Sequence, residues 1–128
     1  MRLALEEAEV EPDQIRHVNA HGTSTPLNDM AEAVAMAEIF GPDGPRVTST
    51  KGITGHALGA AGAIEAVAVV LSMQNGLIPP TAGYAKVDPD MPPIDLVTGS
   101  AAPWEPGISM SNSFGFGGHN GSLVIAPA

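Results

Sequence analysis

Strand-like segments that each end in a short polar loop constrain this 128-residue chain more than any other feature. Three runs have strand character and are followed by a loop containing glycine: 15–21, 47–50 and 108–114. Helical patterns at about 28–40 and 58–73 alternate with these runs, and a last strand-like run covers 122–126. Strands that alternate with helices and then close as a pair predict a layered α/β domain with a mixed sheet.

The sequence also suggests where individual elements begin and end. Residues 1–9 have the pattern of a short amphipathic helix. Asn28 or Asp29 is expected to cap the helix that ends near Phe40, because short polar side chains accept hydrogen bonds from first-turn N–H groups. Glu32 is expected on a solvated helix surface, where a carboxylate suits the helix dipole. The residues 51–56 are expected to form a loop.

The most apolar segment, 57–73, contains one charged residue, Glu65. Its length, and the pair of small residues Gly55 and Gly59 around its start, are compatible with a membrane helix. A carboxylate in the middle of the segment, however, costs roughly 2–3 kcal/mol on insertion. We therefore predict a helix that is buried inside a globular protein.

Composition excludes several classes of function. Five Lys and Arg residues against fourteen Asp and Glu residues give a net charge of -9, so neither nucleic acid nor a membrane surface is an expected partner. The chain contains no cysteine, which excludes disulfides, thiolate zinc sites and a cysteine nucleophile within it. No signal-peptide pattern opens the chain, and a cytoplasmic location is expected.

Polar side chains with catalytic chemistry gather near the predicted strand ends. His21 follows the first strand, and Lys51 and His56 follow the second. Because ligands bind at the carboxyl ends of strands in α/β sheets, these side chains are expected to converge. Glu65 lies 14 residues after Lys51, a spacing that brings a loop ammonium back to a carboxylate on the next helix. Asp29 is close enough in sequence to reach the same strand end.

Two other interpretations stay open at this point. The cluster 112–118 is rich in glycine and aromatic residues but lacks the phosphate-loop pattern, and it forms either a mobile aromatic plug or a plain turn between strands. Two histidines with Asp29 and Glu65 suit zinc or iron, which suggests a metal-dependent hydrolase. HExxH spacing is not present, and no metal is predicted.

Three motifs carry a family resemblance: Val18–Pro26 (VNAHGTSTP), the segment 49–56, and Asn112–Gly118 (NSFGFGG). In this order they resemble the beta-ketoacyl-acyl carrier protein synthases, or ketosynthases, of fatty acid and polyketide synthesis. The resemblance implies the C-terminal half of a thiolase-like fold, with residues 1–128 as one ketosynthase C-terminal domain. The first half of such enzymes carries the acyl-accepting cysteine, so the chain resembles a fragment or one piece of a split enzyme.

The resemblance also implies a role for each matching residue in a decarboxylative Claisen condensation. His21 and His56 would stabilise the charge that forms on the malonyl thioester oxygen, Lys51 would order the site with Glu65, and Asp29 would support the histidines. The implied gate consists of Phe114, Gly115, Phe116 and Gly117. His119 stands where threonine is more usual, and Asn28 replaces a commoner glycine, so the subfamily is not assigned.

The implied partners are a malonyl- or acyl-loaded acyl carrier protein and the cysteine-bearing N-terminal half, within a homodimer of the complete enzyme. No cofactor is implied. The chain alone is expected to be inactive, and to self-associate through the helix near 58–73. The alternative is a non-catalytic subunit that determines chain length in a ketosynthase heterodimer.

Overall fold

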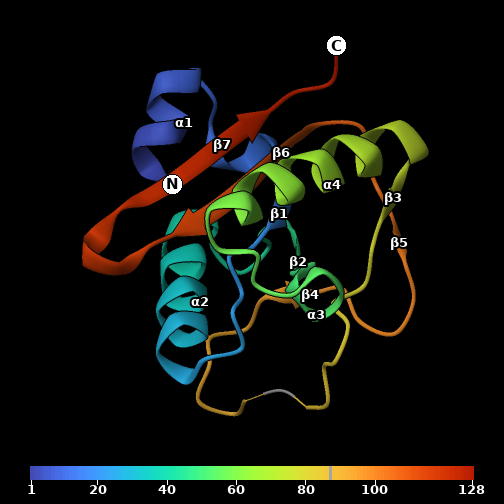
Figure 1. Cartoon of the computed structure of the whole chain (residues 1–128). Helices are drawn as coiled ribbons and strands as arrows, with labels where there is room; N and C mark the ends of the chain where they lie inside the picture. The colour runs from blue at the N-terminus through green and yellow to red at the C-terminus, as the bar shows by residue number, and fades with distance from the viewer. Residues whose placement is uncertain (87) are drawn as a thin grey trace.

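The computed structural model describes residues 1–86 and 88–128. Its centre is a five-stranded sheet with the order β4-β2-β1-β6-β7 (Figure 1). Strands β4, β2, β1 and β6 run parallel, and β7 returns antiparallel to β6. Their bounds are β1 Ile15–Asn19, β2 Arg46–Thr48, β4 Asp95–Leu96, β6 Ile108–Phe114 and β7 Asn120–Ile125. The predicted α/β class with a mixed sheet is confirmed.

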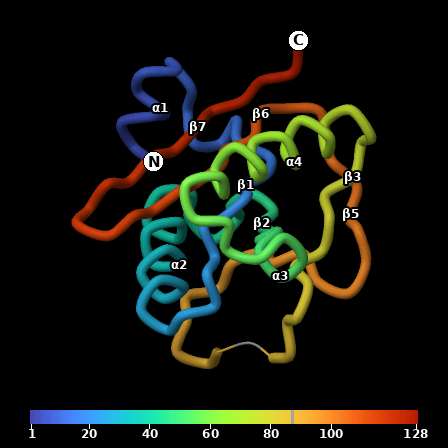
Figure 2. The backbone as a smooth tube through the Cα atoms, viewed as in Figure 1, coloured from blue at the N-terminus to red at the C-terminus, as the bar shows by residue number. Residues whose placement is uncertain are grey.

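Helices cover both faces of this sheet. The longer elements are α1 Arg2–Ala8, α2 Pro26–Phe40 and α4 Ala61–Asn75, whose course can be followed in the backbone trace of Figure 2. A short helix, α3 Lys51–Thr54, follows β2, and 3₁₀ turns lie at Pro12–Gln14, Leu58–Ala60 and Phe116–Gly118. Strands β3 Leu77–Ile78 and β5 Ala102–Pro103 form a separate antiparallel pair.

Two predicted boundaries are wrong for local reasons. Helix α2 begins at Pro26 with Thr25 before it, so neither Asn28 nor Asp29 is its cap. Proline suits the first helical position because its ring fixes φ and its missing N–H would be unpaired there. The segment after β2 is not a plain loop, because Lys51–Thr54 forms one helical turn that Gly55 ends at φ 68°.

The apolar core lies between the sheet and the pair α1 and α2. Val18 and Met110 are fully buried there and pack with Leu5, Met36 and Val47. Because side chains alternate along a strand, the residues on either side of Val18 and of Met110 face α4 instead. Asn19 confirms this direction, since its Nδ2 donates to the backbone oxygen of Glu65, 3.3 Å away.

Helix α4 approaches β6 closely but is not enclosed. A Cβ atom at Gly62 would lie 2.9 Å from Ser113 Oγ, so a larger residue there would require this hydroxyl to move. The stretch Leu58–Asn75 has the length and the mean hydropathy, 1.3, of a membrane helix, yet only 22% of it is buried. A helix of this kind needs partners on all sides, and this chain covers only one of them: α4 packs with one face and leaves Val67 and Leu71 more than half exposed, as expected for the chain alone.

Candidate functional site

The carboxyl ends of β1, β2 and β6 meet at one edge of the sheet, because these strands are parallel. His21 lies two residues beyond β1, Lys51 begins α3 just beyond β2, and Phe114 is the last residue of β6. Glu65 reaches the same place from α4, and His56 from the segment between α3 and α4. The structure thus brings together side chains from five parts of the sequence.

The two histidines approach each other edge to face. Their ring centroids lie 5.5 Å apart with an interplanar angle of 86°. His21 is buried, whereas His56 is exposed toward solvent. The Phe114 ring lies against His21 as well, with centroids 5.7 Å apart.

Lys51 connects His21 to a buried ion pair. Its Nζ contacts Glu65 Oε1, and both side chains are almost fully buried. The same Nζ lies 3.3 Å from His21 Nδ1. This contact between Lys51 and Glu65 is the one that their spacing in the sequence suggests. A buried ammonium next to a buried carboxylate avoids the high cost of leaving either charge unpaired.

The electrostatic setting keeps His21 neutral. Burial, then the positive charge of Lys51 and the proximity of His56, lower the pKa of His21 from 6.5 to about 4, while Asp29 acts in the opposite direction. At neutral pH the ring therefore carries one proton. An ammonium can only donate hydrogen bonds, so Nδ1 of His21 accepts from Lys51 and the proton lies on Nε2.

The Nδ1 atom of His56 also accepts a hydrogen bond, but from a different donor. The backbone N–H of Leu58 donates to His56 Nδ1 at 3.2 Å. In a neutral ring this again places the proton on Nε2. Both imidazoles consequently have their Nδ1 atoms occupied and one N–H donor each to offer a ligand.

Glu32 is the residue that sequence reasoning misplaced. It is 3% exposed, and its carboxylate accepts hydrogen bonds from the backbone N–H groups of His21 and Gly22, both at 2.9 Å. The Nδ2 of Asn112 donates to it at 3.0 Å. Burial raises the pKa of Glu32, and these hydrogen bonds act to lower it. The missed signal is a carboxylate one helical turn after Asp29, on the helix that directly follows the His21 loop.

Asp29 lies at the edge of this arrangement. Its Oδ1 accepts a hydrogen bond from the backbone N–H of Ser24 at 3.2 Å, and it is half-buried. Asp29 therefore holds the loop that follows His21, while its charge affects the pKa of His21 from a distance.

Two glycines are required by the geometry of the loops. Gly22 has φ +43°, and a Cβ there would lie 2.6 Å from Ser49 Cβ. Gly117 has φ +76° in the turn that follows β6, where the Gly115 N–H donates to the His119 oxygen at 3.0 Å. Phe116, at the start of this turn, is fully exposed. The turn thus carries an uncovered aromatic ring on a backbone that glycines leave permissive.

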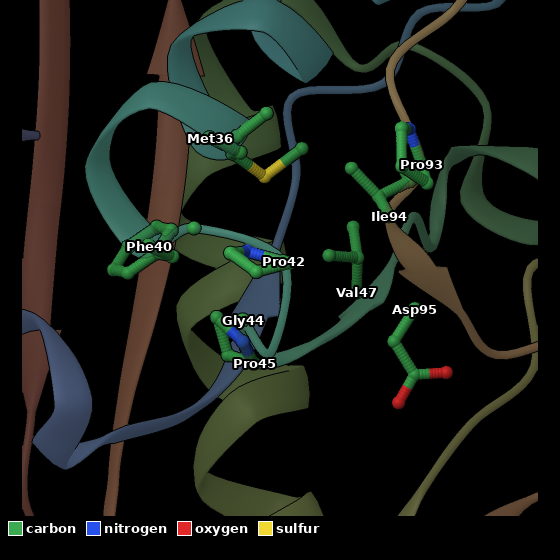
Figure 3. A pocket seen from close by; sticks show the side chains of 11 residues that line it. Met36, Phe40, Pro42, Gly44, Pro45, Val47, Pro93, Ile94 and Asp95 are labelled. Atoms are coloured by element: carbon green, nitrogen blue, oxygen red, sulfur yellow. The ribbon is translucent and has the colours of Figure 1, made fainter.

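A groove of about 840 Å³ opens beside these residues, between the start of α2, α3 and residues of the ranges 81–86 and 88–96. Its lining includes Lys51 and His56, together with Asp29. A second hollow, between the end of α2 and the segment 93–95, has room for little more than one water, about 20 Å³ (Figure 3). Among the described residues no three His, Cys, Asp or Glu side chains are placed to hold a metal ion, so the hydrolase interpretation receives no support from them.

Comparisons with known proteins agree with this architecture. The model of a family described as "Beta-ketoacyl synthase, C-terminal domain" matches residues 1–85. The 3-oxoacyl-(acyl-carrier-protein) synthase 2 of Staphylococcus aureus is 43% identical over 127 residues, which are 98% of this chain and 31% of that protein. The chloroplastic 3-oxoacyl-(acyl-carrier-protein) synthase I of Hordeum vulgare is 40% identical over 98% of this chain and 27% of its own length.

Solved structures give the same result. A beta-ketoacyl synthase from Burkholderia phymatum superposes with a TM-score of 0.96 at 41% identity, covering 100% of this chain and 31% of that one. The ishigamide ketosynthase/chain length factor superposes with a TM-score of 0.94 at 38% identity, covering 99% and 31%. The chain therefore spans about a third of the length of the relatives it matches.

Proposed function

The chain belongs to the beta-ketoacyl synthase C-terminal domain family, and we propose that it supplies the malonyl-decarboxylating histidines of a ketosynthase. The observation that carries this proposal is the pair of imidazoles, His21 and His56, whose ring centroids lie 5.5 Å apart and whose Nδ1 atoms both accept a hydrogen bond. Two N–H donors at one strand end suit an oxygen that gains negative charge during reaction.

In the proposed reaction, the carbon–carbon bond of malonyl carrier protein breaks and releases carbon dioxide. The electron pair moves into the thioester to give an enolate, whose oxygen accepts hydrogen bonds from the Nε2–H groups of His21 and His56. The enolate carbon then attacks an acyl thioester held on a cysteine, forming the new carbon–carbon bond as the carbon–sulfur bond breaks and the cysteine leaves as a thiolate. Since this chain has no cysteine, the nucleophile would come from an N-terminal ketosynthase segment, and the chain alone would be inactive.

The remaining residues would have supporting roles. Lys51 would keep His21 in the Nε2–H form through its contact with Nδ1, and Glu65 would hold the ammonium. Asp29 would order the loop after His21. Phe116 would act as the gate with Gly115 and Gly117, next to Phe114 against His21.

The partners form part of the same proposal. One solved relative is described as a type II polyketide synthase acyl-carrier protein in complex with its ketosynthase, which supports a carrier protein as substrate partner. A homodimer of the complete enzyme and a cytoplasmic location also belong to the proposal. The barley relative, by its name, is a chloroplast protein.

The test is carbon dioxide release from malonyl carrier protein by this chain, with and without a cysteine-bearing N-terminal segment. Release is expected only from the assembly, and His56→Ala is expected to lower it on the order of 10²–10³-fold. An assembly in which His56→Ala leaves release unchanged would show that the assigned role is wrong.

A non-catalytic, chain-length-determining subunit is the second candidate. It is favoured by two solved relatives that contain a ketosynthase with its chain length factor. A chain that assembles with the cysteine-bearing segment and folds, yet releases no carbon dioxide, would support this candidate instead.

A further inference from the structure

A hydrogen-bonded series of polar groups, with Asn112 and Glu32 buried at its centre, crosses from β7 to the His21 loop. Ser122 Oγ on β7 donates to Asn112 Oδ1 on β6 at 2.8 Å. Asn112 Nδ2 donates to Glu32 Oε1 on α2 at 3.0 Å. Glu32 then accepts the backbone N–H groups of His21 and Gly22.

Each contact in the series constrains the next. An amide side chain can present either its oxygen or its nitrogen, and the Glu32 carboxylate, which can only accept, requires the nitrogen of Asn112. The oxygen of Asn112 is then left on the β7 side, where it accepts the hydroxyl hydrogen of Ser122. The Glu32 carboxylate accepts hydrogen bonds from three donors, so the positions of both its oxygens are fixed. The carboxylate in turn fixes the positions of the two backbone N–H groups that donate to it.

The setting is unusual for this face of the sheet. Asn112 is fully buried and follows Met110 at the alternate position of β6, so it lies on the side of the apolar core. An amide and a carboxylate are costly in such a place unless they are fully hydrogen-bonded. The series ends at the backbone of the residue whose ring contacts Lys51 and His56.

We propose that Asn112 and Ser122 are positioning residues, which act through Glu32 to hold His21 where its ring meets the other site residues. Ser122 lies just beyond the turn that carries Phe116, so the same series ties the strand after that turn to the histidine. The effect on reaction rests on the function proposed above. The effect on the His21 loop does not, and it is measured separately.

The first experiment measures hydrogen exchange of the backbone amides of His21 and Gly22 in the 128-residue chain, relative to the Val18 amide of β1. Asn112→Ala is expected to speed exchange at these two amides on the order of tenfold, because it weakens hydrogen bonds to a charged group. Ser122→Ala is expected to have a smaller effect at the same two amides, and Ser122→Thr, which keeps the hydroxyl, is expected to restore the parent rates.

Ser72→Ala is the matched control. Ser72 is also buried, and its hydroxyl donates to the Ala68 oxygen at 2.9 Å within α4, outside the series. It is expected to leave the His21 and Gly22 amides at the parent rate relative to Val18. Unchanged exchange at both amides in Ser122→Ala and in a folded Asn112→Ala would overturn the proposal, and Ser122→Ala decides alone if Asn112→Ala does not fold.

The second experiment compares two half-reactions of the assembled enzyme. Ser122→Ala is expected to slow carbon dioxide release severalfold while acylation of the cysteine keeps the parent rate, because His21 is assigned only to decarboxylation. Equal loss in both half-reactions would indicate general destabilisation and contradict a positioning role. If the parent assembly releases no carbon dioxide, the proposed function is wrong, and the exchange experiment still decides whether the series holds the loop.

Discussion

The two faces of the five-stranded sheet bury different kinds of side chain. Toward α1 and α2, Val18 and Met110 pack in an apolar cluster. Toward α4, the alternate positions of the same strands hold buried polar residues, His17, Asn19, Ser109 and Ser111. Within the described part of the chain, several atoms of this second layer have no hydrogen-bond partner: both His17 ring nitrogens, Asn19 Oδ1, Glu65 Oε2 and Ser111 Oγ.

This difference indicates a division of tasks within one sheet. Burial of apolar area stabilises the fold, whereas buried polar atoms without partners cost stability. The polar face is also the one that carries the contact between Lys51 and Glu65 and leads to His21. We therefore expect the apolar face to supply the stability of the sheet, and the polar face to supply groups that support the site around His21.

The strongest test of this comparison is Lys51→Ala. It leaves the Glu65 carboxylate buried without its cation, and we expect the free energy of unfolding to fall by about 3–5 kcal/mol, measured by chemical denaturation. Lys51→Met combined with Glu65→Leu is expected to regain most of this loss, because no charge is then buried. Lys86→Ala, at an exposed lysine, is the control, with a change of less than about 0.5 kcal/mol. A loss below about 1 kcal/mol for Lys51→Ala would contradict the buried ion pair.

The apolar face is tested by Met110→Ala. Met110 is fully buried, and removing its side chain leaves a cavity, so the expected loss is about 3 kcal/mol in the same measurement. Ser109→Ala changes the neighbouring residue on the opposite face, where Ser109 Oγ accepts the Trp104 indole N–H at 3.3 Å. The expected loss is about 1 kcal/mol. Equal losses at the two positions would remove the distinction between the faces.

The sequence predicted the parts of the site that depend on order along the chain. His21, Lys51 and His56 follow strands, and parallel strands end at one edge, so their convergence follows from the alternation of strands and helices. The place of Glu32 depends instead on the rotation of α2 about its axis. That rotation is set by where the helix begins, at Pro26, and by which residues meet β6.

The exposed side of α4 shows a second limit of the sequence. Ile64, Val67 and Leu71 on one side of the helix, with Ala61 and Val69 on the other, give it an apolar pattern all round, which predicts partners on every side. Only the side toward β6 is covered by this chain. Apolar residues in a sequence indicate that a surface prefers a partner, but they do not say whether that partner belongs to the same chain.

His17 gives the polar face a dependence on pH. Burial lowers the pKa of His17 from 6.5 to about 4, so between these values the unfolded chain binds a proton that the folded chain does not. The free energy of unfolding is therefore expected to fall as the pH drops from 6.5 toward 4, by about 2 kcal/mol at pH 5 from this residue. His17→Phe is expected to remove the contribution of His17 to this pH dependence and to leave the contribution of His21. Chemical denaturation of the parent and of His17→Phe at pH 7 and pH 5 measures the change in free energy of unfolding with pH. The same change in both proteins would mean that His17 is not buried as a neutral ring.

The smallest effect on stability is expected on the outer side of α4. Val67 and Leu71 are 58% and 51% exposed, so Val67→Gln and Leu71→Gln are expected to change the free energy of unfolding by less than about 0.5 kcal/mol each. Their effect should appear in association instead, because together they interrupt an exposed apolar surface. Sedimentation velocity over a range of concentrations is expected to show self-association of the parent chain and a shift toward monomer in the double variant.

Val69→Ala, at a buried position of the same helix, serves as the opposite control, since it should lower stability without reducing association. A parent chain that stays monomeric at every concentration would mean that this surface does not bind a second copy, and would leave a partner of another sequence as its complement.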